Sequence, residues 1–261
     1  MQPEQRRSVL TRSASPPDAV LQYGPRDDQL VDLRLPSRTS APLVVLLHGG
    51  FWRVAWDRTH TRPMADGLAD AGFVVATPEY SRTGDGEGWP ATFDDVALAV
   101  AVLPELVADA VGTHVDATTV ILAGHSAGGH LALWCASRQL PGAYVGVVAL
   151  APVADLAEAF RLDLDSGAVR ELLGGDPDQV PDRYDHADPC RRPAPSVPVV
   201  VVHGTDDATV PPELSRRYST QSAAQLRLLD GIGHFELIDP GSAAWPVVLD
   251  AFEGLARRAL R

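Results

Sequence analysis

Residues 120–129 read VILAGHSAGG, an apolar run that leads directly into a Gly-x-Ser-x-Gly motif. A strand, a very tight turn and a helix form the context in which this motif becomes a nucleophile elbow. Gly124 and Gly128 suit such a turn because a Cβ would clash where the helix packs back on the strand. The motif therefore predicts that Ser126 is raised clear of the backbone, close to the amide N–H groups of a helix start.

The composition is that of a globular protein with room for a large core. The chain has 261 residues, 45% of them hydrophobic, which fits one α/β domain of moderate size. Its formal net charge of −12 argues against nucleic acid or an anionic membrane as a partner, because a phosphate-binding surface needs the opposite sign. A small-molecule substrate is the partner that we expect, and the sequence indicates no oligomeric state.

The cysteines and the N-terminus bear on the compartment. Cys135 and Cys190 are too few for a disulfide framework, and Cys135 is interpreted as a small core residue. Residues 1–20 are rich in serine, proline and arginine, which predicts a flexible tail without the apolar run of a signal peptide. No stretch was identified as a membrane span, so the prediction is a cytoplasmic protein.

Short apolar runs alternate with helical patterns along residues 21–261. A partly exposed strand is predicted at 29–35, and buried strands at 43–47, 73–77, 120–123, 145–150, 199–202 and 225–229. Helices are predicted at 61–71, from Thr92 to about residue 106, and at 246–261; Thr92 and Asp95 are assigned to a capping box. This alternation predicts one α/β domain whose mostly parallel central sheet carries helices on both faces.

Residues 153–198 are too long for a simple connection between two strands. They hold two helical pieces and a proline-rich run, which predicts either a small cap over the site or a crossover without a gating role.

A serine nucleophile needs a base and a carboxylate that orients the base. On a fold of this kind the order along the chain is Ser, acid, His, each at the carboxyl end of a strand. Asp206 and Asp207 follow the strand at 199–202, and His234 follows the strand at 225–229. We predict a triad of Ser126, Asp207 and His234, with Asp206 as the weaker alternative for the acid.

The loop after the first buried strand reads His48-Gly49-Gly50-Phe51-Trp52. Its position predicts that the N–H groups of Gly50 and Phe51, together with that of Ala127, form an oxyanion hole. Trp52 and His125 are weaker candidates for the substrate pocket, and Trp52 could equally be a structural wedge. The chain has no HExxH motif or Cys/His cluster, so neither a metal nor a cofactor is predicted.

These motifs resemble the α/β-hydrolase fold, esterase/lipase branch. More narrowly, HGG-x-W is similar to the kynurenine formamidase group, and the likeness spans about residues 40–255. The resemblance implies a serine hydrolase that cleaves a small ester or aryl formamide through an acyl-enzyme. Alternatives are a serine peptidase of the prolyl-oligopeptidase type, a thioesterase or acyltransferase acting on carrier-bound acyl groups, and a catalytically silent binding module.

Overall fold

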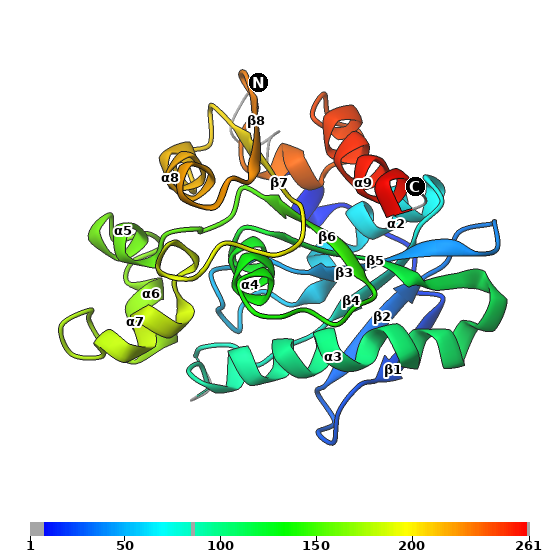
Figure 1. Cartoon of the computed structure of the whole chain (residues 1–261), viewed down its shortest axis with the longest axis horizontal. Coiled ribbons are helices and arrows are strands. Elements are labelled where there is room, and N and C mark those ends of the chain that lie inside the picture. The colour runs from blue at the N-terminus through cyan, green and yellow to red at the C-terminus, as the bar shows by residue number, and fades with distance from the viewer. Residues whose placement is uncertain (1–7, 85–86, 260–261) are drawn as a thin grey trace.

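The computed structural model describes residues 8–84 and 87–259, and an eight-stranded sheet forms its centre (Figure 1). The strand order is β1-β2-β4-β3-β5-β6-β7-β8. β1 and β2 pair antiparallel with each other, and β2 with β4, whereas every later pairing is parallel. The strands are β1 (Ala19–Gln22), β2 (Leu30–Arg34), β3 (Ala41–Leu47), β4 (Val74–Pro78), β5 (Val115–His125), β6 (Tyr144–Leu150), β7 (Val199–Gly204) and β8 (Gln225–Leu229). The predicted, mostly parallel sheet is confirmed.

Helices cover both faces of this sheet. α3, α4 and α8 pack into one hydrophobic cluster, and α2 and α9 pack into a second cluster on the opposite face (Figure 1). The helices are α2 (Arg62–Asp70), α3 (Ala91–Val111), α4 (Ala127–Ala136), α5 (Leu156–Arg161), α6 (Ala168–Leu173), α7 (Pro181–Ala187), α8 (Pro212–Ser222) and α9 (Trp245–Ala259). Residues 260–261 of the predicted last helix lie outside the described residues.

The continuous apolar run of β3 follows from burial on both faces of the sheet. Leu43, Val45 and Leu47 belong to the cluster under α3 and α4, while Val44 and Leu46 belong to the cluster under α2 and α9. Because side chains alternate along a strand, a central strand covered on both sides needs an apolar residue at every position.

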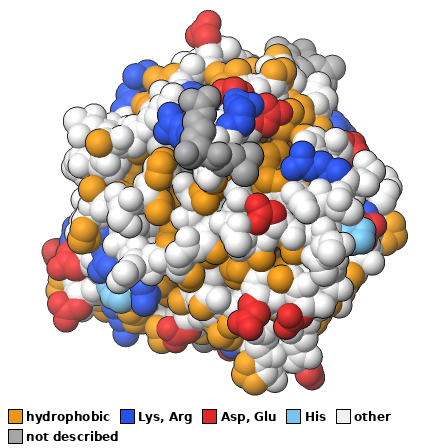
Figure 2. All heavy atoms as spheres, turned by 45° about the vertical axis from the view of Figure 1, so that its right-hand side comes forward, with side chains coloured by type: hydrophobic (Ala, Val, Ile, Leu, Met, Phe, Trp, Pro, Cys, Tyr) orange, Lys and Arg blue, Asp and Glu red, His pale blue; other side chains and the backbone are white. Residues whose placement is uncertain are grey.

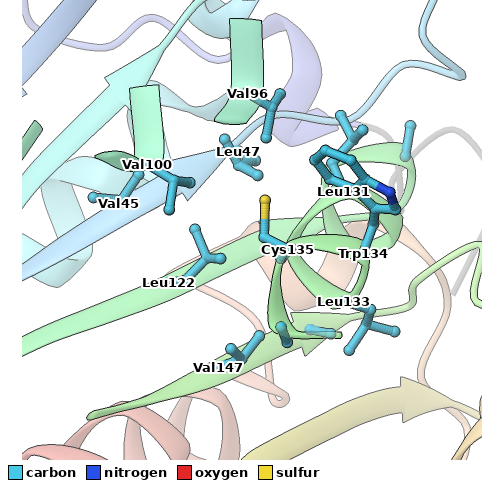
Figure 3. Packing of buried hydrophobic residues seen from close by; sticks show 14 of the residues in the cluster. Val45, Leu47, Val96, Val100, Leu122, Leu131, Leu133, Trp134, Cys135 and Val147 are labelled. Carbon is cyan, nitrogen blue, oxygen red and sulfur yellow. The ribbon is translucent and has the colours of Figure 1, made fainter. Parts of the chain in front are cut away.

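α4 is the most deeply buried helix, and all ten of its residues are buried. Figure 3 shows Cys135 on this helix among Leu47, Val96, Val100 and Leu122, with its sulfur turned toward Leu47. Burial raises the pKa of the Cys135 thiol to about 12. Its interpretation as a small core residue agrees with this position.

α3 differs from its prediction at the N-terminus. The helix begins at Ala91 after Pro90, so Thr92 lies inside it and donates its hydroxyl to the carbonyl oxygen of Ser81 instead of capping. Asp95 accepts from Arg26 and Ser81 rather than from a helix N–H, so the capping-box interpretation was wrong. Both side chains of the expected capping box therefore bond to residues outside the helix, instead of to the backbone N–H groups of the helix start.

α3 and the turn after it also correct the expectation about membrane spans. Residues Ala91–His114 are long and apolar enough, by length and composition alone, to cross a membrane. The core helix of a soluble protein passes the same test. In the structure, one face of α3 packs on β3, β4 and β5, and 33% of the apolar window is buried.

In its described part, residues 8–20, the predicted tail contacts the rest of the domain, and β1 begins at Ala19. A 3₁₀ helix, η1 (Ser8–Thr11), buries Val9 in the cluster of α2 and α9. Arg12 forms a two-pronged ion pair with Asp239, at 2.6 and 2.8 Å. Burial of the apolar residues Val9 and Leu10 stabilises the contact of this otherwise polar stretch with the domain. Residues 1–7 lie outside the described residues.

Residues 153–198 form α5, α6 and α7, which lie together at one side of the molecule (Figure 1). Leu172, Leu173 and Tyr184 belong to the same hydrophobic cluster as α3 and α4. His130 and Trp134 on α4 each donate a ring N–H to a backbone carbonyl of this segment, at 2.9 and 3.0 Å. The segment therefore shares the main core, and whether it moves as a lid stays a prediction.

The acidic excess is distributed rather than gathered on the face that Figure 2 shows. Asp and Glu side chains lie there among basic and hydrophobic side chains. Many of the acids form ion pairs, such as Asp250 with Arg227 and Arg257.

Candidate active site

The predicted elbow is present at the junction of β5 and α4. Ser126 lies between them with φ 56° and ψ −117°, a backbone conformation that residues other than glycine rarely adopt. A Cβ on Gly124 would lie 2.1 Å from the carbonyl oxygen of Gly128, and one on Gly128 would lie 2.1 Å from that of Leu47. Both positions therefore require glycine, for the steric reason that the sequence suggested.

Backbone hydrogen bonds hold the strained serine on both sides. Its N–H donates to the carbonyl oxygen of Leu150 at 2.8 Å, and its own carbonyl accepts from His130 N–H at 2.9 Å. Strain of this kind persists where the surroundings over-determine it, and it concentrates at functional sites.

Asp207 and His234 meet although 26 residues separate them in the chain. Asp207 Oδ2 lies 2.6 Å from His234 Nδ1, and Asp207 Oδ1 accepts from the N–H groups of Thr209 and Val210, both at 2.8 Å. Because the carboxylate occupies Nδ1, Nε2 is the His234 nitrogen left for a reacting group. The alternative acid, Asp206, is exposed on the same turn.

The electrostatics keep Asp207 ionised. Burial by itself raises the pKa of this carboxyl, because Asp207 is only 7% exposed. The charge of His234 and the hydrogen bonds from His203 and His234 outweigh burial and hold its pKa well below the ordinary range. His203 is fixed locally by Ser215 Oγ at 2.6 Å and the Val210 carbonyl at 2.9 Å, as expected of a histidine at a strand end.

Ser126 and His234 line one cavity of about 280 Å³. This is at or below the lower end of the range usual for small-molecule sites, so the cavity suits a small group. Its walls are mainly apolar or aromatic at Leu10, Phe51, Trp56 and Phe235. The remaining lining residues are Gly50, His60, His125, Asp165 and Thr209.

The loop expected to hold the oxyanion turns beside Ser126. Gly50, Phe51 and Trp52 have consecutive positive φ values of 108°, 49° and 58°. The approach is close, since a Cβ on Gly49 would lie 3.2 Å from the Cβ of Ser126. Gly50 and Phe51 line the cavity on this side, and Ala127 opens α4 on the other, where the first helical N–H groups lack intrahelical acceptors.

Hydrogen bonds to Glu79 and from Tyr80 hold this loop in place. The Glu79 carboxylate accepts from the backbone N–H of Arg58 at 3.1 Å and lies 2.8 Å from His48 Nε2. Tyr80 donates its hydroxyl to the carbonyl oxygen of His48 at 2.7 Å. Burial by itself raises the pKa of Glu79, but the hydrogen bond and charge of His48, with the charge of Arg82, outweigh burial and lower the pKa to about 2.

The structure places Trp52 outside the candidate cavity, in its alternative role as a structural wedge, and places His125 in the cavity wall. Trp52 is 0% exposed and lies in the main core with its ring 5.1 Å from that of His130, so it is a wedge under the loop. Trp56, which is 40% exposed, takes the place at the cavity wall. His125 lines the cavity, and its Nε2 donates to the carbonyl oxygen of His234 at 3.1 Å.

Several lining residues were not predicted from the sequence, among them Leu10, His60, Asp165 and Thr209. Leu10 belongs to the docked η1 segment, and the apolar pair Val9-Leu10 within a polar stretch was the available signal. Within residues 8–84 and 87–259, no group of three or more His, Cys, Asp or Glu side chains is placed to hold a metal ion.

Comparison with known proteins gives a family and a set of relatives. A family model described as BD-FAE matches residues 31–221. Esterase LipQ of Mycobacterium tuberculosis is 27% identical over 223 residues, which cover 76% of this chain and 50% of that protein. A kynurenine formamidase of Danio rerio is 31% identical over 112 residues, 42% of this chain and 35% of that protein. The chain thus spans half the length of the first relative and about a third of the second.

Solved structures give the fold. Esterase B from Lactobacillus rhamnosis superimposes with a TM-score of 0.78 at 19% identity, over 98% of this chain and 91% of that one. A truncated carbohydrate esterase from gut microbiota gives 0.75 at 18% identity, over 93% of this chain and 100% of that one. At these identities the likeness shows the fold alone, and the predicted α/β-hydrolase fold is confirmed, as is the resemblance to esterases and kynurenine formamidases.

Proposed function

Because the chain belongs to the BD-FAE family, we propose that it is a serine hydrolase that cleaves small esters through Ser126, Asp207 and His234. The observation that carries the proposal is the geometry of one cavity. A strained serine at the elbow shares this cavity with a histidine whose Nδ1 lies 2.6 Å from a buried carboxylate. The named esterase and formamidase relatives support the same reaction class.

The proposed reaction begins at Ser126. His234 Nε2 takes the hydroxyl proton while Oγ attacks the carbonyl carbon of the substrate, and Asp207 stabilises the imidazolium that forms. The N–H groups of Gly50, Phe51 and Ala127 hold the negative oxygen of the tetrahedral intermediate. His234 then gives the proton to the departing alcohol or amine, which leaves an acyl-enzyme on Ser126. Water, deprotonated by His234, releases the acid and restores the serine.

The cavity favours a short acyl group, because about 280 Å³ must hold both the acyl group and the reacting atoms. A second candidate is hydrolysis of an aryl formamide, since a formyl group is the smallest acyl group and a kynurenine formamidase is among the relatives. The two candidates share every catalytic step and differ in the acyl group and in the leaving group, which is an alcohol for the ester and an aromatic amine for the formamide.

The test compares kcat/KM on p-nitrophenyl acetate, p-nitrophenyl butyrate and N-formylkynurenine, with Ser126→Ala as the control. Labelling with a fluorophosphonate probe reports the nucleophile independently of the substrate. Ester turnover and labelling that both disappear in Ser126→Ala would support the proposal. Dominant activity on the formamide would select the second candidate. An unlabelled wild-type protein that turns over none of these substrates would contradict both.

A further inference from the structure

A second cavity adjoins the first and is larger. It has a volume of about 580 Å³ and lies between η1 with the residues after it and the loop at 54–62. Leu10, Trp56 and His60 line both cavities, so these three residues form the boundary between them. A molecule that reacts at Ser126 and extends past this boundary enters the second cavity.

The second cavity is lined by polar groups but carries little uncompensated charge. Its three arginines already have acidic partners. Arg12 pairs with Asp239, Arg62 pairs with Asp32, and Arg82 pairs with Glu79 while also donating to the carbonyl oxygen of Trp56. Asp32 and Glu79 also pair with Arg58, so these two carboxylates serve three arginines, and Asp57 in the lining supplies the remaining negative charge. With the charges balanced in this way, the cavity suits a neutral polar group better than an anion.

His60 presents an acceptor at the boundary. Its Nδ1 lies 2.6 Å from the backbone carbonyl oxygen of Asp57. A carbonyl oxygen only accepts, so Nδ1 carries the proton and, in the neutral ring, Nε2 carries the lone pair. Burial, followed by the charge of His48, lowers the pKa of His60 to about 4, which keeps the ring neutral near pH 7.

His60 lines both cavities, and its Nε2 atom has no hydrogen-bond partner among the described residues. This atom is not among the fully buried polar atoms that lack a partner. Trp56 stands against the same ring, edge to face at 5.6 Å, and fixes its orientation. An aromatic wall and a preset acceptor thus face the path out of the catalytic cavity.

We propose that the cavity over Trp56 and His60 binds the leaving group of the substrate, and that His60 Nε2 accepts a hydrogen bond from an O–H or N–H of that group. The inference rests on the proposed function and adds the substrate class: a short acyl group joined to a neutral leaving group that carries a hydrogen-bond donor. The small, mostly apolar cavity at Ser126 takes the acyl side.

The test uses two acetates that differ only in donors on the leaving group, propyl acetate and glycerol 1-acetate. Acid release is titrated at constant pH, and the quantity compared is the ratio of their kcat/KM values. We expect His60→Phe to lower this ratio, glycerol ester over propyl ester, about five- to tenfold, which is the effect of losing one hydrogen bond. His60→Gln keeps an acceptor and should restore part of the ratio.

The matched control is His114→Phe. His114 Nδ1 also bonds a backbone carbonyl three residues earlier, that of Val111 at 3.0 Å, but its side chain is exposed and lies outside both cavities. The ratio should be unchanged in this variant. If His60→Phe does not fold, Ala55→Trp narrows the second cavity from its exposed wall and should lower the ratio too, whereas Val20→Trp on the exposed edge strand should not.

Three results would overturn the inference. The first is a ratio that His60→Phe and Ala55→Trp leave unchanged while both acetates are hydrolysed. The second concerns methyl 3-hydroxybutyrate and methyl butyrate, which differ by a hydroxyl on the acyl side. The inference fails if His60→Phe lowers the kcat/KM ratio of this pair more than it lowers the ratio of the glycerol ester over the propyl ester. The third is an enzyme without Ser126-dependent ester hydrolysis, which defeats the proposed function and the inference with it. The first two leave the proposed function intact.

Discussion

His125 Nε2 donates a hydrogen bond to the backbone carbonyl oxygen of His234 across 3.1 Å, with the two imidazole rings 4.5 Å apart. This bond ties the residue before the elbow serine to the loop that carries the proposed base. The bond acts through the backbone of His234, so we expect His125 to hold the position of the His234 loop. Burial, followed by the charge of His234, lowers the pKa of His125 well below its ordinary value and keeps the ring neutral.

His125→Phe should lower kcat about tenfold and raise KM less. The substitution leaves the carbonyl oxygen of His234 without its donor in a buried site, which costs about 1–3 kcal/mol in the free energy of unfolding. Steady-state kinetics on a short-chain ester and urea unfolding measure both effects. His125→Gln retains an N–H donor and should recover part of kcat; equal kcat in the wild type and His125→Phe would refute this positioning role.

Asp207→Asn should reduce kcat/KM about 10³- to 10⁴-fold, because the carboxylate no longer orients and stabilises the histidine. Asp206→Asn is the matched control on the same turn. Its side chain is exposed and the Asp207 carboxylate occupies His234 Nδ1, so we expect a change below about threefold. Ester hydrolysis by both variants at one pH decides between the two aspartates, and the reverse ranking would overturn the assignment of the acid.

Gly128→Ala should prevent folding or lower the unfolding midpoint by many degrees. Its Cβ would lie 2.1 Å from the carbonyl oxygen of Leu47 and 2.3 Å from that of His48, and backbone atoms of a central strand cannot move aside. Gly254→Ala, in α9, is the control, because a Cβ there meets nothing within 4 Å. The control should gain roughly 0.5–1 kcal/mol from helix preference. Thermal unfolding monitored by circular dichroism tests both, and a Gly128→Ala protein as stable as the wild type would contradict the packing argument.

Glu79 should make the stability depend on pH in the acid range. Its pKa is about 2 in the folded protein and near 4.5 without these contacts, so the folded chain binds fewer protons between those values. The stabilisation is therefore complete above about pH 4.5 and is lost as the pH falls through about 2, by up to roughly 3 kcal/mol.

The measurement is the free energy of unfolding by urea at several pH values from 2.5 to 6. The wild type should lose stability more steeply on acidification than Glu79→Gln, which cannot titrate at this position. Parallel curves for the two proteins would show that Glu79 contributes nothing to the acid dependence.

Local sequence determined the elements that depend on nearest neighbours. The apolar runs of β3, β5 and β7 were predictable because a strand buried on both faces needs an apolar residue at every position. The elbow was predictable because only glycine fits where α4 packs back on β5. The chain order of Ser126, Asp207 and His234 followed from the rule that such groups stand at strand ends.

The tertiary structure alone decided which residues surround the serine. Leu10 reaches the cavity because η1 docks across the molecule near η5 (Phe235–Ile238), and Trp56 replaces Trp52 there because the loop turns with positive φ at three successive residues. Asp95, which was predicted to cap a helix, instead accepts hydrogen bonds from Arg26 and Ser81. Each of these outcomes depends on contacts between segments that are distant in the chain. Such segments compete for the same side chains, and a local sequence pattern carries no information about that competition.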